Sequence, residues 1–194
     1  TPLYSSAASD VYKRQPICEF GKKAEDFKLK SIYGELVSLE QIKGANGTLV
    51  MFICNHCPYV KAIITDLIED CKNLKSYKIN SVAIMSNDTK NYPEDSFDKM
   101  IQFAKNNKFG DLNYLIDETQ EVAKKYGAVC TPDFFGFNKN LELQYRGRIR
   151  ELRDLKPVRN GDSDLKVAMK MIAETQRGPV EQIPSMGCNI KWFN

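Results

Sequence analysis

The sequence predicts a single α/β domain in which helices flank a central mixed β-sheet. The chain has 194 residues, the length of one ordinary domain, and 42% of them are hydrophobic, which suffices for one core. Continuous apolar runs alternate with segments whose apolar residues recur every three or four positions, as buried strands alternate with amphipathic helices. A hairpin pattern near residues 132–148 adds antiparallel strands, so we expect a mixed sheet.

The first elements are predicted from turn residues and from one apolar run. Residues 16–47 mix short apolar segments with turn residues, and residues 32–35 are typical of the tip of a β-hairpin. This hairpin would extend the domain at its N-terminal side. Residues 48–54 then form a continuous apolar run between Gly47 and Asn55, which predicts a strand buried on both faces.

After this strand the apolar period changes to three and four residues. Apolar positions 60, 63, 64, 67, 71 and 74 predict an amphipathic helix, and Pro58 suits its first turn. Strands at 81–85 and 113–116, and helices from about residue 94 and at 163–175, continue the alternation. Asp117 and Gln120 predict a capping box for a short helix that stops at Gly127.

We expect residues 1–15 to be a non-native or disordered leader, and residues 16–194 to form the domain. Residues 10–15 resemble the translation of a transposon adaptor used in sequencing-library preparation; a genuine disordered terminus is the alternative. We expect a cytoplasmic protein, although under the adaptor interpretation a secretion signal could have been lost with the native start.

Charge and hydropathy argue against several classes of function. The formal net charge is +3, and no basic cluster of the kind found in nucleic-acid or membrane-surface binders stands out. Arg146, Arg148, Arg150 and Arg153 form a local basic stretch that predicts a solvated face. No run approaches the roughly 18 apolar residues of a transmembrane helix.

Two cysteines carry the main chemical prediction. Six cysteines are too few for a disulfide-stapled fold of this length, and only Cys54 and Cys57 have the spacing of a motif. They lie where the buried strand meets the helix, whose free N–H groups and dipole should stabilise a thiolate at Cys54. The thiolate attacks disulfides, and Cys57 would resolve the mixed disulfide. His56, the only histidine, would stabilise the thiolate further when protonated.

The motifs resemble a known family. The order of strand, CxxC, helix and a later Thr131-Pro132 turn is similar to the thioredoxin fold. Segments 52–61, 126–133 and 187–192 resemble a peroxiredoxin-like group of the alkyl hydroperoxide reductase/thiol-specific antioxidant superfamily, and the resemblance extends over residues 16–194. It implies a cis bond before Pro132 beside the CxxC, and at Thr131 a backbone that pairs with a substrate peptide. An ordinary trans proline that opens a strand is the alternative.

We therefore expect a thiol–disulfide oxidoreductase that serves cell redox homeostasis without a cofactor. Its partners would be a disulfide-containing protein or small thiol and an electron-donating thiol reductase, with neither nucleic acid nor membrane. A thiol peroxidase with antioxidant activity is one alternative. The resemblance argues against it, because peroxiredoxins place a Thr three residues before the peroxidatic cysteine and an Arg near the proline. If Cys57 is peroxidatic, Cys54 replaces that Thr, and no Arg adjoins Pro132.

The other alternative is a copper- or zinc-binding module that uses the same residues. Cys54, His56, Cys57 and Cys130 would be its ligands if Cys130 comes across at the proline turn. The prediction of a redox dithiol, in contrast, assigns no metal to these residues.

The remaining cysteines carry weaker predictions. Cys71 lies on the apolar face of the first long helix and should be a core residue. Cys130 is an accessory thiol for which burial is favoured over relay chemistry. Cys188 is either a plain tail thiol or a resolving thiol for Cys130 or for the CxxC pair, and Cys18 receives no role.

Overall fold

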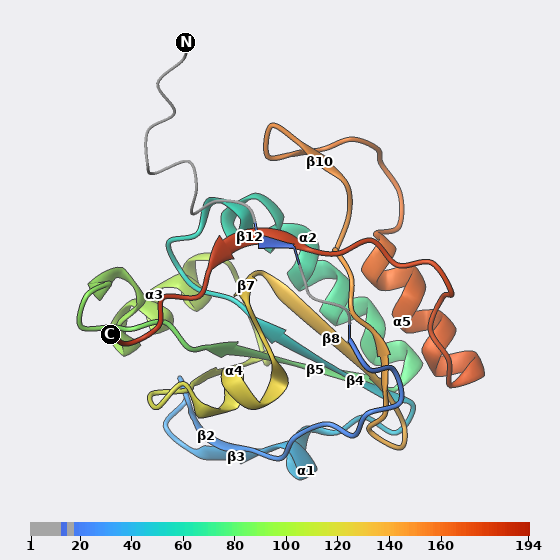
Figure 1. The fold of residues 1–194 in the computed structure, drawn as a ribbon, viewed down its shortest axis with the longest axis horizontal. Helices are drawn as coiled ribbons and strands as arrows, with labels where there is room; N and C mark the ends of the chain where they lie inside the picture. Colours follow the sequence, from blue (N-terminus) through green and yellow to red (C-terminus); the bar gives the residue numbers. More distant parts are fainter. Residues whose placement is uncertain (1–12, 15–17) are drawn as a thin grey trace.

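A mixed β-sheet forms the centre of the protein (Figure 1), as the sequence predicts. The computed structural model describes residues 13–14 and 18–194, and of residues 13–14 only the backbone. Within this part, the main sheet has seven strands in the order β3-β2-β6-β5-β4-β8-β9. Their bounds are β2 Lys28–Ser31, β3 Leu36–Ser38, β4 Gly47–Phe52, β5 Ile79–Met85, β6 Asn113–Ile116, β8 Asp133–Asn138 and β9 Leu143–Tyr145.

Parallel strands occupy the middle of this sheet and antiparallel strands its two sides. β4, the fully buried apolar run, pairs parallel with β5, and β5 pairs parallel with β6. The hairpin β8–β9 continues antiparallel from β4, and the N-terminal hairpin β2–β3 continues antiparallel from β6. Both predicted hairpins are therefore confirmed.

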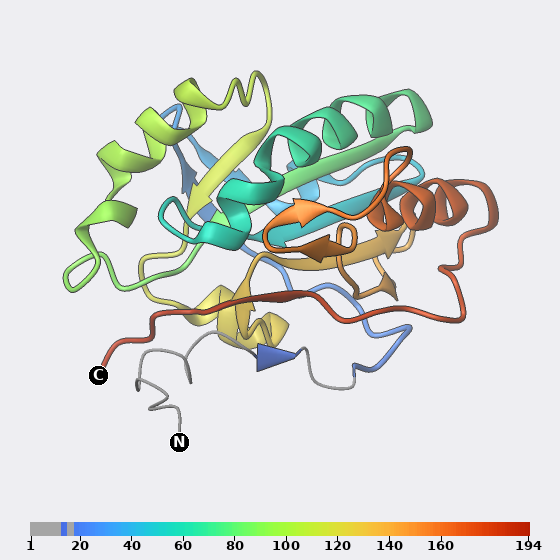
Figure 2. The ribbon, with the colours of Figure 1, turned by 90° about the horizontal axis from the view of Figure 1, so that it is seen from above.

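Helices cover both faces of the sheet, and each face has its own apolar core (Figure 2). On one face, β4 side chains such as Leu49 and Met51 pack against α2, α3 and α5. On the other face, Val50 and Phe52 pack in the cluster that includes residues of α1 and α4. The helix bounds are α1 Leu39–Ile42, α2 Pro58–Leu74, α3 Phe97–Asn106, α4 Glu121–Tyr126 and α5 Asp164–Thr175, with 3₁₀ turns η2 Lys75–Tyr77 and η3 Pro93–Asp95. No helix of the described residues has the length and apolar character needed to cross a bilayer.

A smaller sheet brings the C-terminal segment back to the start of α2. β12 (Met186–Asn189) lies between β7 (Cys130–Thr131) and β1 (Lys13–Arg14) and is antiparallel to both. In Figure 1 this red strand crosses beside β7 and the beginning of α2. β1 is the part of the predicted leader that is described, and the rest of that leader lies outside the described residues. A separate two-stranded hairpin consists of β10 (Leu152–Arg153) and β11 (Lys156–Pro157).

The predicted capping box at α4 is wrong, although the helix does stop at Gly127, which has φ 69°. The Asp117 carboxylate does accept the Ala123 N–H, at 2.9 Å. Gln120, however, turns its side chain inward, where Nε2 donates to the carbonyls of Ser86 and Lys191, each at 2.8 Å. The loop carbonyls of Ser86 and Lys191 need hydrogen-bond donors, and the Gln120 side chain supplies them, so it does not cap the helix.

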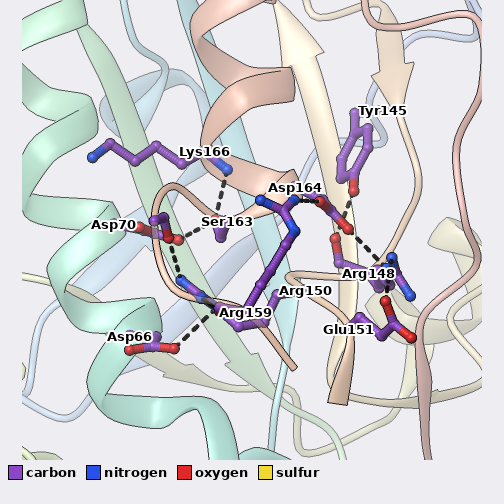
Figure 3. A network of polar contacts seen from close by, with 11 residues as sticks. Asp66, Asp70, Tyr145, Arg148, Arg150, Glu151, Arg159, Ser163, Asp164 and Lys166 are labelled. Atoms are coloured by element: carbon purple, nitrogen blue, oxygen red, sulfur yellow. Dashed lines mark hydrogen bonds and ion pairs between the residues drawn. The ribbon is translucent and has the colours of Figure 1, made fainter. Parts of the chain in front are cut away.

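The prediction of a solvated arginine face is also wrong in part. The Arg146 side chain is buried, lies 3.2 Å from the Asp133 carboxylate and stacks over the Phe135 ring at 4.4 Å. Figure 3 shows that Arg148 and Arg150 also face carboxylates, Asp164 at 2.8 Å and Asp66 at 3.1 Å. Arg153 is exposed, as expected. Burial of an arginine is stable here because each buried guanidinium has an acidic partner.

Candidate active site

One of the two motif cysteines, Cys57, lies at the start of α2. The helix begins at Pro58, and Cys57 is its N-cap residue. The Val60 N–H donates to the Cys57 sulfur, one of the helix-terminal donors that have no partner within the helix. Cys54, predicted to occupy this position, lies three residues earlier, at the end of the strand. The expected stabilisation of a Cys54 thiolate by the helix is therefore wrong, and it applies to Cys57.

The two CxxC sulfurs are in hydrogen-bond contact and have opposite pKa shifts. The pKa of Cys57 is held far below the usual value because its sulfur accepts hydrogen bonds from the Cys188 and Cys54 thiols, and from backbone N–H groups. The pKa of Cys54 is raised because it donates to Cys57, is buried, and lies near the Asp95 carboxylate. The geometry favours a thiolate at Cys57 and a thiol at Cys54.

The proline turn lies directly against both sulfurs. The Thr131–Pro132 peptide bond is cis, as predicted. Thr131 Oγ1 lies 3.5 Å from Cys54 Sγ, and in its thiol form Cys57 donates to the Thr131 carbonyl at 3.1 Å. The backbone of Thr131, expected to pair with a substrate peptide, instead pairs with Cys188 of β12. The chain's own C-terminal strand thus lies where we expected an external peptide.

His56 belongs to a hydrogen-bond network around a buried aspartate. Its Nδ1 lies 2.7 Å from Asp95 Oδ2, and its ring stacks on Tyr92 with centroids 5.8 Å apart. The hydrogen bond to Asp95 is the main cause that raises the His56 pKa, so the imidazolium is favoured. The shift favours the predicted cation, but its partner is Asp95, and of the two thiols it is Cys57 whose charge adds to the pKa shift of His56.

The remaining contacts of Asp95 hold the CxxC loop in place. The Asn55 N–H donates to Asp95 Oδ1 at 2.8 Å, and the Asn87 amide donates to Oδ2 at 2.8 Å. The Asn55 side chain in turn accepts from the Tyr114 hydroxyl at 2.8 Å. Since Asp95 and Tyr114 are fully buried, these bonds fix the loop between Cys54 and Cys57 from the core side.

Of the other cysteines, Cys188 makes hydrogen bonds to the CxxC pair. The Cys188 thiol and its backbone N–H both donate to Cys57 Sγ. Cys130 is buried, as expected, and its sulfur is directed at the Pro132 carbonyl at 3.5 Å. Cys71 is a buried core residue of α2, as predicted.

The ligand set expected for a metal is not the set that the structure brings together. Cys54 and His56 lie near Asp95, their ligand atoms within 4.8 Å of one another, whereas Cys130 is not part of this group of described residues. Both Asp95 oxygens already accept hydrogen bonds, and His56 faces Asp95 itself. The arrangement is that of a hydrogen-bond network.

Sequence reasoning missed Asp95, Tyr92 and Tyr114 as residues of this site. Their signals are weak, because each lies far along the chain from the CxxC. Asn55 is the one such signal inside the motif, because its polar side chain needs a hydrogen-bond partner once the loop is buried.

Comparison with known proteins agrees with the fold. Residues 20–151 match the model of the AhpC/TSA family. The chain belongs to this family. A crystal structure of an uncharacterized conserved protein from Geobacillus kaustophilus has 38% sequence identity and a TM-score of 0.89, covering 94% of this chain and 96% of that chain. A hypothetical protein from Sinorhizobium meliloti 1021 has 35% identity and a TM-score of 0.85, covering 93% and 99%.

More distant structures share the fold alone. A secreted Mycobacterium tuberculosis disulfide oxidoreductase has 14% identity and a TM-score of 0.52, covering 61% of this chain and 80% of that chain. Peroxidoxin BcpB from the same organism has 17% identity and a TM-score of 0.53, covering 64% and 81%. No curated protein gave a match. The predicted thioredoxin-like fold and the peroxiredoxin-like family are confirmed.

Proposed function

We propose that the protein is a thiol–disulfide oxidoreductase whose redox dithiol is Cys54 and Cys57. One observation carries the proposal: the Cys57 sulfur lies at the start of α2, accepts the Val60 N–H and contacts the Cys54 sulfur. A thiolate next to a second thiol is the arrangement that thiol–disulfide exchange requires. We therefore propose Cys57 as the attacking sulfur and Cys54 as the second thiol, the reverse of the order expected from the sequence.

His56 and Pro132 would then act as positioning residues. Asp95 holds the His56 ring beside the loop, and the cis Thr131–Pro132 turn brings an oxygen to each sulfur. A stabilised thiolate favours the reduced form, so the pair should be more oxidising than an unperturbed dithiol. A reduction potential above the cytosolic glutathione range of roughly −220 to −320 mV would indicate an oxidant or isomerase, and one below it a reductase.

The experiment is the exchange of the reduced protein with a small disulfide, followed by mapping of the protein disulfide that forms. We expect a Cys54–Cys57 bond, and loss of exchange in Cys57→Ser. Cys71→Ser, which changes a core thiol of the same helix, is the matched control and should exchange normally. Exchange that persists in Cys57→Ser would refute the proposal.

A thiol peroxidase is a second candidate, supported by the same stabilised thiolate at a helix start. Against it, the three arginines nearest the proline turn in sequence are paired with carboxylates: Arg146 with Asp133, Arg148 with Asp164, and Arg150 with Asp66. Hydrogen-peroxide consumption that survives Cys54→Ser but is lost in Cys57→Ser would favour the peroxidase. A purified protein that carries stoichiometric metal and has unreactive thiols would instead favour the metal-binding alternative.

A further inference from the structure

The C-terminal strand β12 is fitted closely against the proline turn. It runs antiparallel to β7, with Cys188 opposite Thr131 and Asn189 opposite Cys130. At Gly187 the two backbones approach so closely that a Cβ would lie 2.1 Å from the Thr131 carbonyl oxygen. Only glycine allows this separation, so the strand position depends on residue 187.

Hydrogen bonds fasten the segment on both sides of Cys188. The Ser185 hydroxyl donates to the Pro132 carbonyl at 2.8 Å. The Lys191 N–H donates to Asn87 Oδ1 at 2.9 Å, and Gln120 Nε2 donates to the Lys191 carbonyl at 2.8 Å. The segment is therefore an integral part of the fold.

Cys57 consequently has two thiol neighbours. Cys54 contacts it from the CxxC loop and Cys188 from β12, and both donate a hydrogen bond to its sulfur. The exposures of the three differ: Cys54 and Cys57 are 1% and 0% exposed, whereas Cys188 is partly exposed. Of these three residues, Cys188 is therefore the one that solvent reaches.

We propose that Cys188 is a third redox-active thiol, which exchanges disulfides with Cys57 and connects the buried dithiol to reductants in solution. The proposal rests on the proposed function, since it needs a Cys54–Cys57 disulfide. It extends that function by naming the route of the electrons and the class of donor, a dithiol.

The exchange needs no oxidant beyond the Cys54–Cys57 disulfide. The Cys188 thiolate attacks Cys57 Sγ, the Cys57–Cys188 bond forms, and the Cys54–Cys57 bond breaks. Cys54 leaves as a thiolate and takes up the proton that Cys188 released. A dithiol reductant then attacks the Cys188 sulfur and Cys57 leaves as the thiolate. The second thiol of the reductant closes its own disulfide and frees Cys188, so two electrons enter the protein.

Cys130 is the nearby thiol that could compete, because it lies close enough to interact electrostatically with Cys57 and Cys188, but its hydrogen bond goes to neither sulfur. Its sulfur is directed at the Pro132 carbonyl at 3.5 Å, and its strand neighbour is Asn189. Consecutive side chains of β7 point to opposite sides, so Cys130 and Thr131 cannot both face the Cys54 sulfur.

The test is disulfide mapping of Cys54→Ser after oxidation with diamide. Free thiols are blocked under denaturing conditions and peptides are identified without reduction. We expect a Cys57–Cys188 bond in Cys54→Ser, and a Cys54–Cys57 bond in wild type and in the Cys71→Ser control. A Cys57–Cys130 or intermolecular bond in Cys54→Ser would overturn the inference while the Cys54–Cys57 bond upholds the proposed function. Absence of the Cys54–Cys57 bond from both wild type and Cys188→Ser would overturn the proposed function itself.

A further variant tests the route by rate. Reduction of the Cys54–Cys57 disulfide by dithiothreitol should be slower in Cys188→Ser than in wild type. Equal rates in the two proteins, with folding checked by circular dichroism, would contradict the proposal.

Discussion

Helix α2 carries two buried cysteines with opposite properties. Cys57, at its N-terminus, and Cys71, near its other end, are 0% and 4% exposed. Burial raises the pKa of Cys71 to about 12, whereas the pKa of Cys57 is lowered. The difference shows that burial alone suppresses a thiolate, and that donors at a helix terminus reverse the effect. Of two buried thiols, only the one that accepts several hydrogen bonds favours the thiolate.

The largest expected effect of this difference is on activity. Cys57→Ser should reduce disulfide exchange to background, because no other described thiol combines the helix N-terminus with two thiol donors. Cys71→Ser should leave the rate near that of wild type. The measurement is the rate at which the reduced protein consumes a small disulfide at neutral pH. Similar rates for Cys57→Ser and Cys71→Ser would contradict the proposed difference between the two cysteines.

The thiolate itself should be visible spectroscopically. Native protein should show thiolate absorbance in the ultraviolet at neutral pH, which Cys57→Ser removes and Cys71→Ser retains. Because the folded pKa of Cys57 lies below its unfolded value of about 8.5, the thiolate's contribution to the free energy of unfolding is fully present above that pH. It is lost as the pH falls through the folded pKa. Absence of thiolate absorbance at neutral pH would contradict the assignment.

The charge of Asp95 should have a smaller effect, with a defined sign. Asp95→Asn should lower the pKa of His56, which Asp95 raises, and also lower that of Cys54. Since the folded pKa of His56 lies above its unfolded value of about 6.5, its stabilising contribution is present below that pH and is lost as the pH rises through the folded pKa. Nuclear magnetic resonance of the single imidazole gives the titration directly. An unchanged midpoint in Asp95→Asn would show that the ion pair does not control His56.

The smallest effect concerns a helix N-terminus that serves stability alone. At α5 the Ser163 hydroxyl accepts the Lys166 N–H at 2.9 Å and donates to the buried Asp70 carboxylate, so Ser163→Ala should lower the free energy of unfolding by about 2 kcal/mol. Thiolate absorbance and exchange should remain those of wild type. Chemical denaturation measures the loss, and a simultaneous change at the thiols would show that the two helix starts are coupled.

Most of the fold could be predicted because its signals are local. The apolar run that became β4 and the three- and four-residue spacing in α2 are properties of neighbouring residues. The prediction for Gln120 is wrong because its contacts are not local. Its side chain is held by the carbonyls of Ser86 and Lys191, which are distant in sequence. The prediction for Arg146 is wrong for the same reason, because its partner Asp133 lies on β8.

At the site, the residue types were predictable but their roles were not. Proline fits the first helical position, so Pro58 marks Cys57 as the N-cap, a signal that the sequence contained. The pairing of Asn55 with Asp95 joins residues 40 positions apart, and the Cys57–Cys188 contact joins β12 to α2. Long-range contacts of this kind leave no periodic signal in a single sequence.

The place of β12 in the chain has a consequence for biosynthesis. Every strand of the main sheet, and Cys54 and Cys57 with them, leaves the ribosome before residues 186–189 are made. A domain generally folds as a unit, so the site stays incomplete until these last residues are made. A nascent chain would therefore present an uncovered pair of thiols to the surrounding solution until β12 emerges and docks beside β7. Oxidative damage to this protein should accordingly fall most heavily on newly made copies.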